Sequence, residues 1–153
     1  MSRDLANSFY EALAAGDGET MANLYGPDAI FEDPAFGVLH GSDAGDMWRM
    51  LCAGGTDLRV DHTIESSTDA VVVTNWIARY TFGPTKRPVR NDVTATMKFQ
   101  DGKIVEHRDQ FNFWKWSAQA LGMPGRLLGW SPFLRAKVRK TTATNLAKFQ
   151  SKK

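Results

Sequence analysis

The chain has 153 residues, of which 42% are apolar and 11% aromatic, so it is large enough for one folded domain and too apolar for a disordered segment. A single cysteine, Cys52, excludes an internal disulfide, and no Cys-x-x-Cys spacing indicates a structural zinc site. The net charge of +2 conceals an asymmetry, because residues 1–109 carry −7 whereas residues 110–153 carry nine basic residues and no acidic one.

Helical signals dominate the first third of the chain. Apolar residues at helical spacing predict a first helix that Gly16 ends, and Asp17 is placed to cap a second helix, which Gly26-Pro27 should end. A short strand over residues 29–32 and an irregular loop then precede a third helix over residues 42–55.

After the third helix the apolar period changes from 3.6 to 2, which is typical of strands with one buried face. Asp101-Gly102 is a strong hairpin signal, because both turn residues must tolerate a positive φ. Helices followed by a run of antiparallel strands indicate an α+β fold. The alternation predicts four strands, over residues 58–64, 70–82, 89–99 and 103–113.

A helix over residues 114–121 and a glycine-containing linker follow the strands, and Ser131-Pro132 opens a last helix that runs to about residue 149. We therefore expect a domain over residues 1–122 and a basic helical extension over 123–153, packed on the domain or on a partner subunit. The other interpretation of its positive charge is attraction to a membrane surface or a nucleic acid, although no nucleic-acid motif supports the latter.

The last predicted strand carries a polar pair inside an apolar stripe. Val105, His107, Asp109, Phe111 and Phe113 share one face, because strand side chains alternate. Burying an imidazole and a carboxylate there costs free energy unless the two groups satisfy each other or a ligand. The pair is therefore the first indication of a functional site.

Two stretches carry a family resemblance: AAGDGETMANLYGPDAIFEDPAFGVLHG at residues 14–41 and GKIVEHRDQFNFW at residues 102–114. Together they resemble the nuclear transport factor 2-like superfamily, which includes ketosteroid isomerase, limonene epoxide hydrolase and the SnoaL-type polyketide cyclases. The resemblance implies a cone-shaped α+β fold, with N-terminal helices packed on a strongly curved, mostly antiparallel sheet, here with a C-terminal helical extension. It implies less about the reaction, because this fold hosts many chemistries and also proteins with none.

The resemblance to ketosteroid isomerases implies that Asp33, in a Glu-Asp-Pro turn, is a general base. The two oxyanion donors of that family fall on Phe9 and Ala95, neither of which donates a hydrogen bond. Steroid-type isomerisation would therefore require Tyr10 or Trp76 as a substitute donor.

The resemblance to limonene epoxide hydrolases places their catalytic aspartate at Asp109, but their arginine and second aspartate fall on Trp76 and Ala78. The hydrolase triad is therefore broken, and the water-activating tyrosine and asparagine of that family fall on Phe31 and Asp33. SnoaL-type cyclases, which need no cofactor, place an aspartate and a histidine in comparable positions. His107 and Asp109 agree best with that pattern.

We expect Asp33, His107 and Asp109 to point into one cavity between the sheet and the first three helices. Either aspartate would remove a proton from carbon or from water, while His107 orients or charge-balances it and returns the proton. No cofactor and no metal ion are expected. The cavity walls, which would contact the substrate, are expected to be apolar: Phe9, Phe31, Trp48, Trp76, Met97 and Phe111.

Each site residue also has a structural interpretation. Asp33 would cap its own turn, His107 would be a core histidine bonded to the backbone or to Asp109, and Asp109 would pair with a helix end or Arg79. Two functions therefore stay open. One is a cofactor-independent isomerase, cyclase, dehydratase or hydrolase acting on a small, largely apolar molecule. The other is a non-catalytic module that holds a small ligand or binds a protein.

No apolar run approaches the length of a membrane span, and the first residues lack a signal-peptide pattern, so we expect a soluble cytoplasmic protein. The family usually dimerises through the outer face of the sheet. Val71, Val73 and Ile77 make the outward set of the long strand apolar enough for that contact. We expect a homodimer with a small apolar ligand and no nucleic-acid partner.

Overall fold

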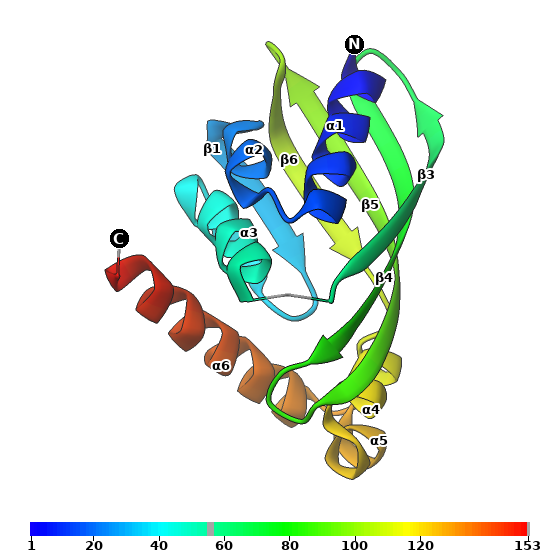
Figure 1. Ribbon diagram of the computed structural model, residues 1–153, viewed down its shortest axis with the longest axis vertical. Coiled ribbons are helices and arrows are strands. Elements are labelled where there is room, and N and C mark those ends of the chain that lie inside the picture. The colour runs from blue at the N-terminus through cyan, green and yellow to red at the C-terminus, as the bar shows by residue number, and fades with distance from the viewer. Residues whose placement is uncertain (55–56, 153) are drawn as a thin grey trace.

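One strongly curved six-stranded sheet organises the computed structural model, which describes residues 1–54 and 57–152 (Figure 1). The strand order is β2-β1-β6-β5-β4-β3, and every neighbouring pair is antiparallel except β1 and β6, which are parallel. The expected cone-shaped α+β fold with a mostly antiparallel sheet is confirmed. The strands are β1 (Tyr25–Asp33), β2 (Gly37–His40), β3 (Arg59–Ser67), β4 (Val71–Phe82), β5 (Arg87–Gln100) and β6 (Lys103–Gln110).

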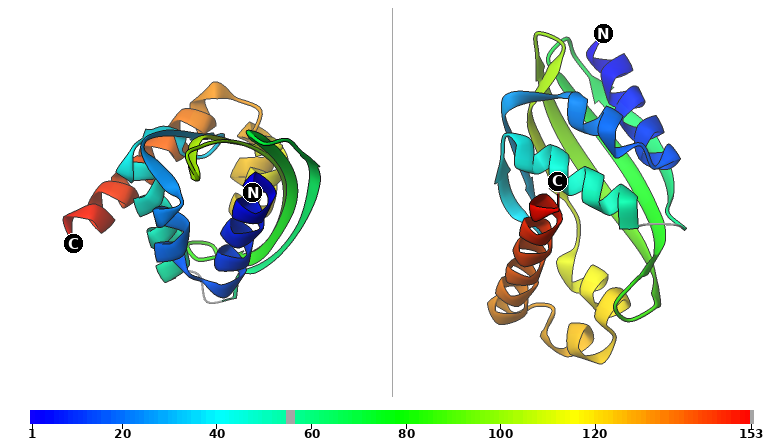
Figure 2. Two further views of the ribbon diagram at one scale, coloured as in Figure 1. Left: turned by 90° about the horizontal axis from the view of Figure 1, so that it is seen from above. Right: turned by 60° about the vertical axis from the view of Figure 1, so that its left-hand side comes forward.

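Three N-terminal helices lie against the concave side of this sheet, and seen from above the sheet curves around α1 (Figure 2). Three further helices follow β6: two lie at the end of the molecule opposite the N-terminus, and the last runs from there back along the body toward the third helix (Figure 1). The helices are α1 (Ser2–Ala15), α2 (Gly18–Asn23), α3 (Ser42–Gly54), α4 (Phe113–Leu121), α5 (Met123–Leu128) and α6 (Pro132–Ser151).

Several turn and cap signals of the sequence form as expected. Gly16 adopts a left-handed conformation with φ 73° after α1, and the Asp17 side chain accepts a hydrogen bond from the Thr20 amide at the start of α2. Asp101 and Gly102 have φ of 53° and 75°, as a tight hairpin turn requires. The expected end of the third helix at Gly55 lies outside the described residues.

Three local expectations are wrong. Gly26-Pro27 does not end a helix, because both residues lie inside β1, where a shift of register between Tyr25 and Ile30 accommodates the proline. The loop expected before α3 contains β2, a short edge strand paired with β1. The glycine linker contains α5, whose Gly125 packs so closely on α4 that a Cβ there would overlap the Ser117 carbonyl oxygen.

The inward face of the last strand also differs in detail. The β5–β6 register shifts between Lys98 and Phe99, so Ile104 rather than Val105 is buried in the core. The strand ends at Gln110, and Phe113 begins α4 instead of continuing the strand. His107 and Asp109 keep their expected inward positions.

The C-terminal helix α6 packs on the body through both apolar and polar contacts. Leu134 and Leu146 are buried, and Thr142 donates a hydrogen bond of 3.1 Å to the Ala35 carbonyl. Near its end, Gln150 donates to the carboxylates of Asp43 and Asp46 at the start of α3. The basic extension therefore contacts acidic residues of the domain itself.

Within the described residues, no helix combines the length and the apolar character that a membrane crossing requires.

Candidate functional site

The three predicted site residues lie on two neighbouring strands. Asp33 ends β1, whereas His107 and Asp109 lie on β6. The two strands run parallel with Phe31 opposite His107, so the same register brings Asp33 level with Asp109 on the inward face.

A chain of hydrogen bonds links His107 to Tyr25 through one ring nitrogen and to Asp109 through the other. Trp48 Nε1 donates to Tyr25 Oη at 2.8 Å, Tyr25 Oη lies 2.7 Å from His107 Nδ1, and His107 Nε2 lies 2.8 Å from Asp109 Oδ1. An indole only donates and an ionised carboxylate only accepts. Every group is satisfied when the Tyr25 hydroxyl donates to Nδ1 and the Nε2 proton of a neutral imidazole is donated to Asp109. We call these four residues the His107 chain.

Aromatic rings enclose the imidazole of His107, which is 1% exposed. Phe31 and Phe9 present their edges at centroid distances of 5.0 and 5.5 Å, while Tyr25 and Trp48 stack at 6.0 and 6.3 Å. Three of the side chains expected as cavity walls, Phe9, Phe31 and Trp48, therefore pack directly around the histidine together with Tyr25 and hold its ring plane fixed.

The other expected wall residues lie around this cluster. Met97 is fully buried opposite His107 on β5. Trp76, on β4, has its ring 6.2 Å from that of Trp48. Phe111 follows β6 directly and is half-buried between the main core and the helices of the extension.

Three buried donors lie beside the His107 chain without a partner. Tyr10 Oη, Thr74 Oγ1 and Trp76 Nε1 make no hydrogen bond to any residue that the structure describes. The Tyr10 and Trp76 rings are 5.9 Å apart, and Thr74 and Trp76 are neighbours on the inward face of β4. We call these three residues the donor trio.

Two members of the donor trio lie near Asp109. Burial, and next to it the Asp109 charge, raise the pKa of Tyr10 well above its usual value. The register places Thr74 opposite Ala95 and Ala95 opposite Asp109, so Thr74 and Asp109 lie on one row of the sheet, two strands apart. Tyr10 and Thr74 are therefore close to the Asp109 carboxylate, and Trp76 adjoins both of them.

Asp33 accepts hydrogen bonds from two amides of its own turn. Its Oδ1 lies 2.9 Å from the Ala35 nitrogen and 2.5 Å from the Phe36 nitrogen, as the structural interpretation of this residue expects. Burial raises the pKa of Asp33 to about 7, with a further contribution from the Asp109 charge, whereas the amides and Arg139 of α6 act in the opposite direction. Asp33 therefore takes up a proton at a much higher pH than an exposed aspartate does.

Sequence reasoning missed Tyr25 and Thr74. The expected end of the second helix at Gly26-Pro27 places Tyr25 in that helix, whereas in the structure Tyr25 begins β1. Thr74 carries a usable signal, because it is the polar residue on the otherwise apolar inward face of β4. The pairing of Asp109 with Arg79 is wrong, since Arg79 pairs with Asp61 at 2.9 Å on the outer face.

In the part of the chain that the structure describes, no cluster of three or more histidine, cysteine or acidic side chains is arranged to hold a metal ion.

Comparison with known proteins places these features in a family. The SnoaL-like domain family matches residues 6–107 of the chain. No curated protein matches.

The chain is similar in structure to a putative polyketide cyclase from Xanthomonas campestris pv. campestris, with 17% identity and a TM-score of 0.66 over 76% of this chain and 94% of that one. It is similar to a putative isomerase from Bacillus subtilis, with 20% identity and a TM-score of 0.65 over 78% and 91%. An LEH-like epoxide hydrolase from M. tuberculosis matches with 22% identity and a TM-score of 0.62 over 82% and 93%. These identities establish a shared fold, and the neighbours carry different chemistries on it.

Proposed function

The chain belongs to the SnoaL-like domain family, and from that premise we propose that it is a cofactor-independent enzyme that moves a proton on a small, largely apolar carbonyl compound. The observation that carries the proposal is the donor trio beside Asp109. Buried donors without partners cost free energy, and an acceptor oxygen on a ligand would satisfy them.

In the proposed reaction, Asp109 removes a proton from the carbon next to the substrate carbonyl. The C–H electron pair moves into the C–C bond and the negative charge gathers on the carbonyl oxygen. The Tyr10 hydroxyl and the Trp76 indole N–H donate hydrogen bonds to that oxygen. One such donor is typically worth about 3–4 kcal/mol of barrier. Tyr10 and Trp76 would thus replace the family donors whose positions fall on Phe9 and Ala95.

His107 acts on Asp109 in this proposal. Its Nε2 proton stabilises the carboxylate before the reaction and holds it in one orientation, while Tyr25 fixes the tautomer from the other side of the ring. Asp109 then returns the proton to the same carbon or, in a substrate with a C=C bond conjugated to the enolate, to the far carbon of that conjugated system. If Asp33 supplies the proton instead, Asp109 loses its proton to water and Asp33 regains one before the next turnover. The pKa of Asp33 near 7 suits a group that both gives and takes protons at neutral pH.

The aromatic surroundings favour an apolar substrate, which displaces little bound water and leaves its single polar group to the donor trio. Asp109 is 4% exposed, so substrate access requires side chains around it to move. Phe111 is suited to such a movement, because it is half-buried and follows the end of β6.

The proposal is tested by deuterium exchange in D₂O with a panel of small enolisable ketones, aldehydes and β-dicarbonyl compounds. We expect the wild-type protein to introduce deuterium next to a carbonyl in at least one compound, and Asp109→Asn to reduce the rate by a factor of about 10²–10⁴. The matched control is Asp61→Asn, which removes an exposed aspartate from the outer face.

Equal exchange rates with wild type and Asp109→Asn would show that Asp109 is not the base. Binding of panel compounds without exchange by the wild type would favour the second candidate, a module that only holds a small ligand.

We also infer a homodimer through the outer face of the sheet. Val71, Val73 and Ile77 are half-buried on that face of β4 and leave apolar surface for a second copy. Sedimentation velocity at micromolar concentration should give the mass of a dimer, and a monomer mass would contradict the inference.

A further inference from the structure

Large apolar side chains are exposed at the end of the molecule formed by α4, α5 and the start of α6. This end lies opposite the N-terminus along the longest axis (Figure 1). Phe133 is 70% exposed and Trp130 is 59% exposed, whereas the aromatic side chains of the core are almost completely buried. We call the exposed set the apolar tip: Trp114, Met123, Leu127, Leu128, Trp130 and Phe133.

Hydrogen bonds and close packing fix the conformation of the apolar tip. Trp114 Nε1 donates to the Arg126 carbonyl at 2.9 Å and Trp130 Nε1 donates to the Leu127 carbonyl at 2.8 Å, so both indole N–H groups are satisfied within the tip. A Cβ at Gly129 would overlap the Ser117 side chain, which shows how closely this turn lies on α4. The rings are thereby held with their apolar surfaces outward.

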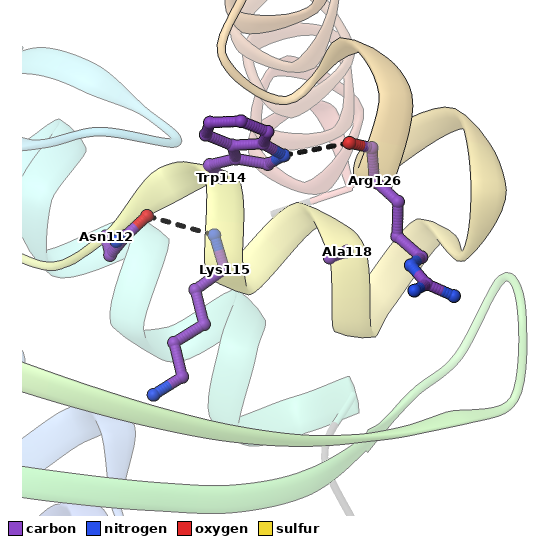
Figure 3. A pocket seen from close by; sticks show the side chains of 5 residues that line it. All are labelled: Asn112, Trp114, Lys115, Ala118 and Arg126. Carbon is purple, nitrogen blue, oxygen red and sulfur yellow. Dashed lines mark hydrogen bonds between the residues drawn. The ribbon is translucent and has the colours of Figure 1, made fainter.

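Positive charge borders the apolar tip. Lys115 and Arg126, with Trp114, line a surface hollow of about 370 Å³, in which their side chains extend on either side of Ala118 (Figure 3). Across residues 1–54 and 57–152, no carboxylate forms an ion pair with either cation. The sequence after Asp109 holds nine basic residues and no acidic one.

The charge decides between possible occupants of this surface. A second copy of the chain bound through the same surface would bring its Lys115 and Arg126 toward those of the first copy, which is unfavourable in a two-fold contact. Exposed tryptophan and phenylalanine beside aliphatic side chains and lysine or arginine are the composition of segments that bind the interface of an anionic membrane.

We propose that the apolar tip inserts into the interfacial region of an anionic lipid bilayer, with Lys115 and Arg126 contacting lipid phosphate groups. Insertion would bury Phe133 and Trp130 among the acyl chains and place the hollow beside Trp114 at the level of the headgroups. The body of the protein would stand on the membrane with its N-terminus away from it (Figure 1). This inference is independent of the proposed reaction.

The test is co-sedimentation of the purified full-length protein with two kinds of vesicle, phosphatidylcholine alone and phosphatidylcholine mixed with phosphatidylglycerol. We expect binding to the anionic vesicles that weakens in high salt, and binding at least about tenfold weaker to the neutral ones. Trp130→Ala combined with Phe133→Ala should weaken binding to anionic vesicles at least about tenfold. Lys115→Gln combined with Arg126→Gln should weaken it severalfold and reduce its salt dependence.

The matched control is Ile30→Ala combined with Val38→Ala. These changes remove two exposed apolar side chains of β1 and β2, which are 43% and 49% exposed and do not belong to the apolar tip. Circular dichroism of each variant checks that the fold is retained. Binding that is absent, equal for both vesicle types, or equally reduced by the control overturns the proposal. So does self-association of the wild type that the Trp130 and Phe133 changes abolish, because the tip would then be a protein interface.

Discussion

Two buried polar groups lie side by side on the concave face of the sheet, and they differ in how their hydrogen bonds are satisfied. In the His107 chain every donor meets an acceptor, from Trp48 through Tyr25 to Asp109. In the donor trio none of the three donors has a partner within the described residues. A satisfied chain needs no ligand to complete its hydrogen bonds, whereas an unsatisfied group costs about 1–3 kcal/mol and calls for a ligand. The unpaired donors therefore indicate where a ligand oxygen would bind, and Asp109 belongs to the proposed site because the donor trio lies beside it.

The largest expected effect concerns the donor trio. Tyr10→Phe and Trp76→Phe should each lower the rate of carbon-bound deuterium exchange by about 10²–10³, since each removes one donor to the developing oxyanion. Tyr10→Phe should leave the free energy of unfolding unchanged or raise it, because an unsatisfied buried donor disappears. Trp76→Phe also removes buried ring volume, so it should lower the free energy of unfolding. Exchange kinetics and urea unfolding on the same samples measure both. A loss of stability with full activity would show that the trio is structural.

The His107 chain should respond in the opposite way. Tyr25→Phe removes an acceptor for Trp48 and a donor for His107, and we expect it to lower the free energy of unfolding by about 1–3 kcal/mol. Tyr10→Phe is the matched control, because it makes the same change in another buried tyrosine of the core. Equal effects of the two variants on urea unfolding would erase the distinction between the two groups.

Asp33 should make the free energy of unfolding depend on pH. Its pKa is raised in the folded state to about 7, so between about pH 4 and pH 7 the folded protein holds a proton that the unfolded chain has released. Stability of the wild type should therefore fall as pH rises through this window. Asp33→Asn keeps an acceptor for the turn amides but cannot titrate. It should therefore abolish this loss of unfolding free energy, which we expect to be on the order of 1–2 kcal/mol after partial screening by water.

Urea midpoints of wild type and Asp33→Asn from pH 4 to pH 8 measure that difference. Parallel curves for the two proteins would show that Asp33 titrates at its ordinary pKa and is a turn cap only.

The smallest effect links α6 to the site. Arg139 lowers the pKa of Asp33, and its side chain lies over Gly37 in the turn that Asp33 begins. Arg139→Gln should move the pH midpoint of the Asp33 effect upward by a few tenths of a unit, whereas Lys140→Gln, an exposed neighbour, should leave it unchanged. Equal shifts in both variants would point to net charge rather than to the position of Arg139.

The sequence predicted much of this arrangement because strand alternation and turn residues are local signals. The inward positions of His107 and Asp109 follow from a period of two, and the caps at Gly16 and Asp17 follow from single residues. Tyr25 was missed because Gly26-Pro27 reads locally as a helix end, while its inclusion in β1 depends on pairing with β6, far along the chain.

Two other differences have the same origin. The burial of Ile104 in place of Val105 depends on a register shift against β5, which no local pattern reveals. The glycines that read as a flexible linker are needed for close contact between α5 and α4, as Gly125 shows. The missing partners of the donor trio are likewise a property of the packed structure, since any of the three side chains alone is unremarkable in sequence.

The most direct test of the account uses Asp109→Asn, whose neutral side chain imitates the base after it has taken the substrate proton. We expect this variant to bind 4-nitrophenol as the coloured phenolate at a pH where the free phenol is largely protonated, because the donor trio would hold the anionic oxygen. Adding Tyr10→Phe or Trp76→Phe should weaken that binding at least about tenfold. If the variant leaves the absorbance and ionisation of the phenol unchanged, the trio does not receive an oxyanion and the proposed reaction is wrong.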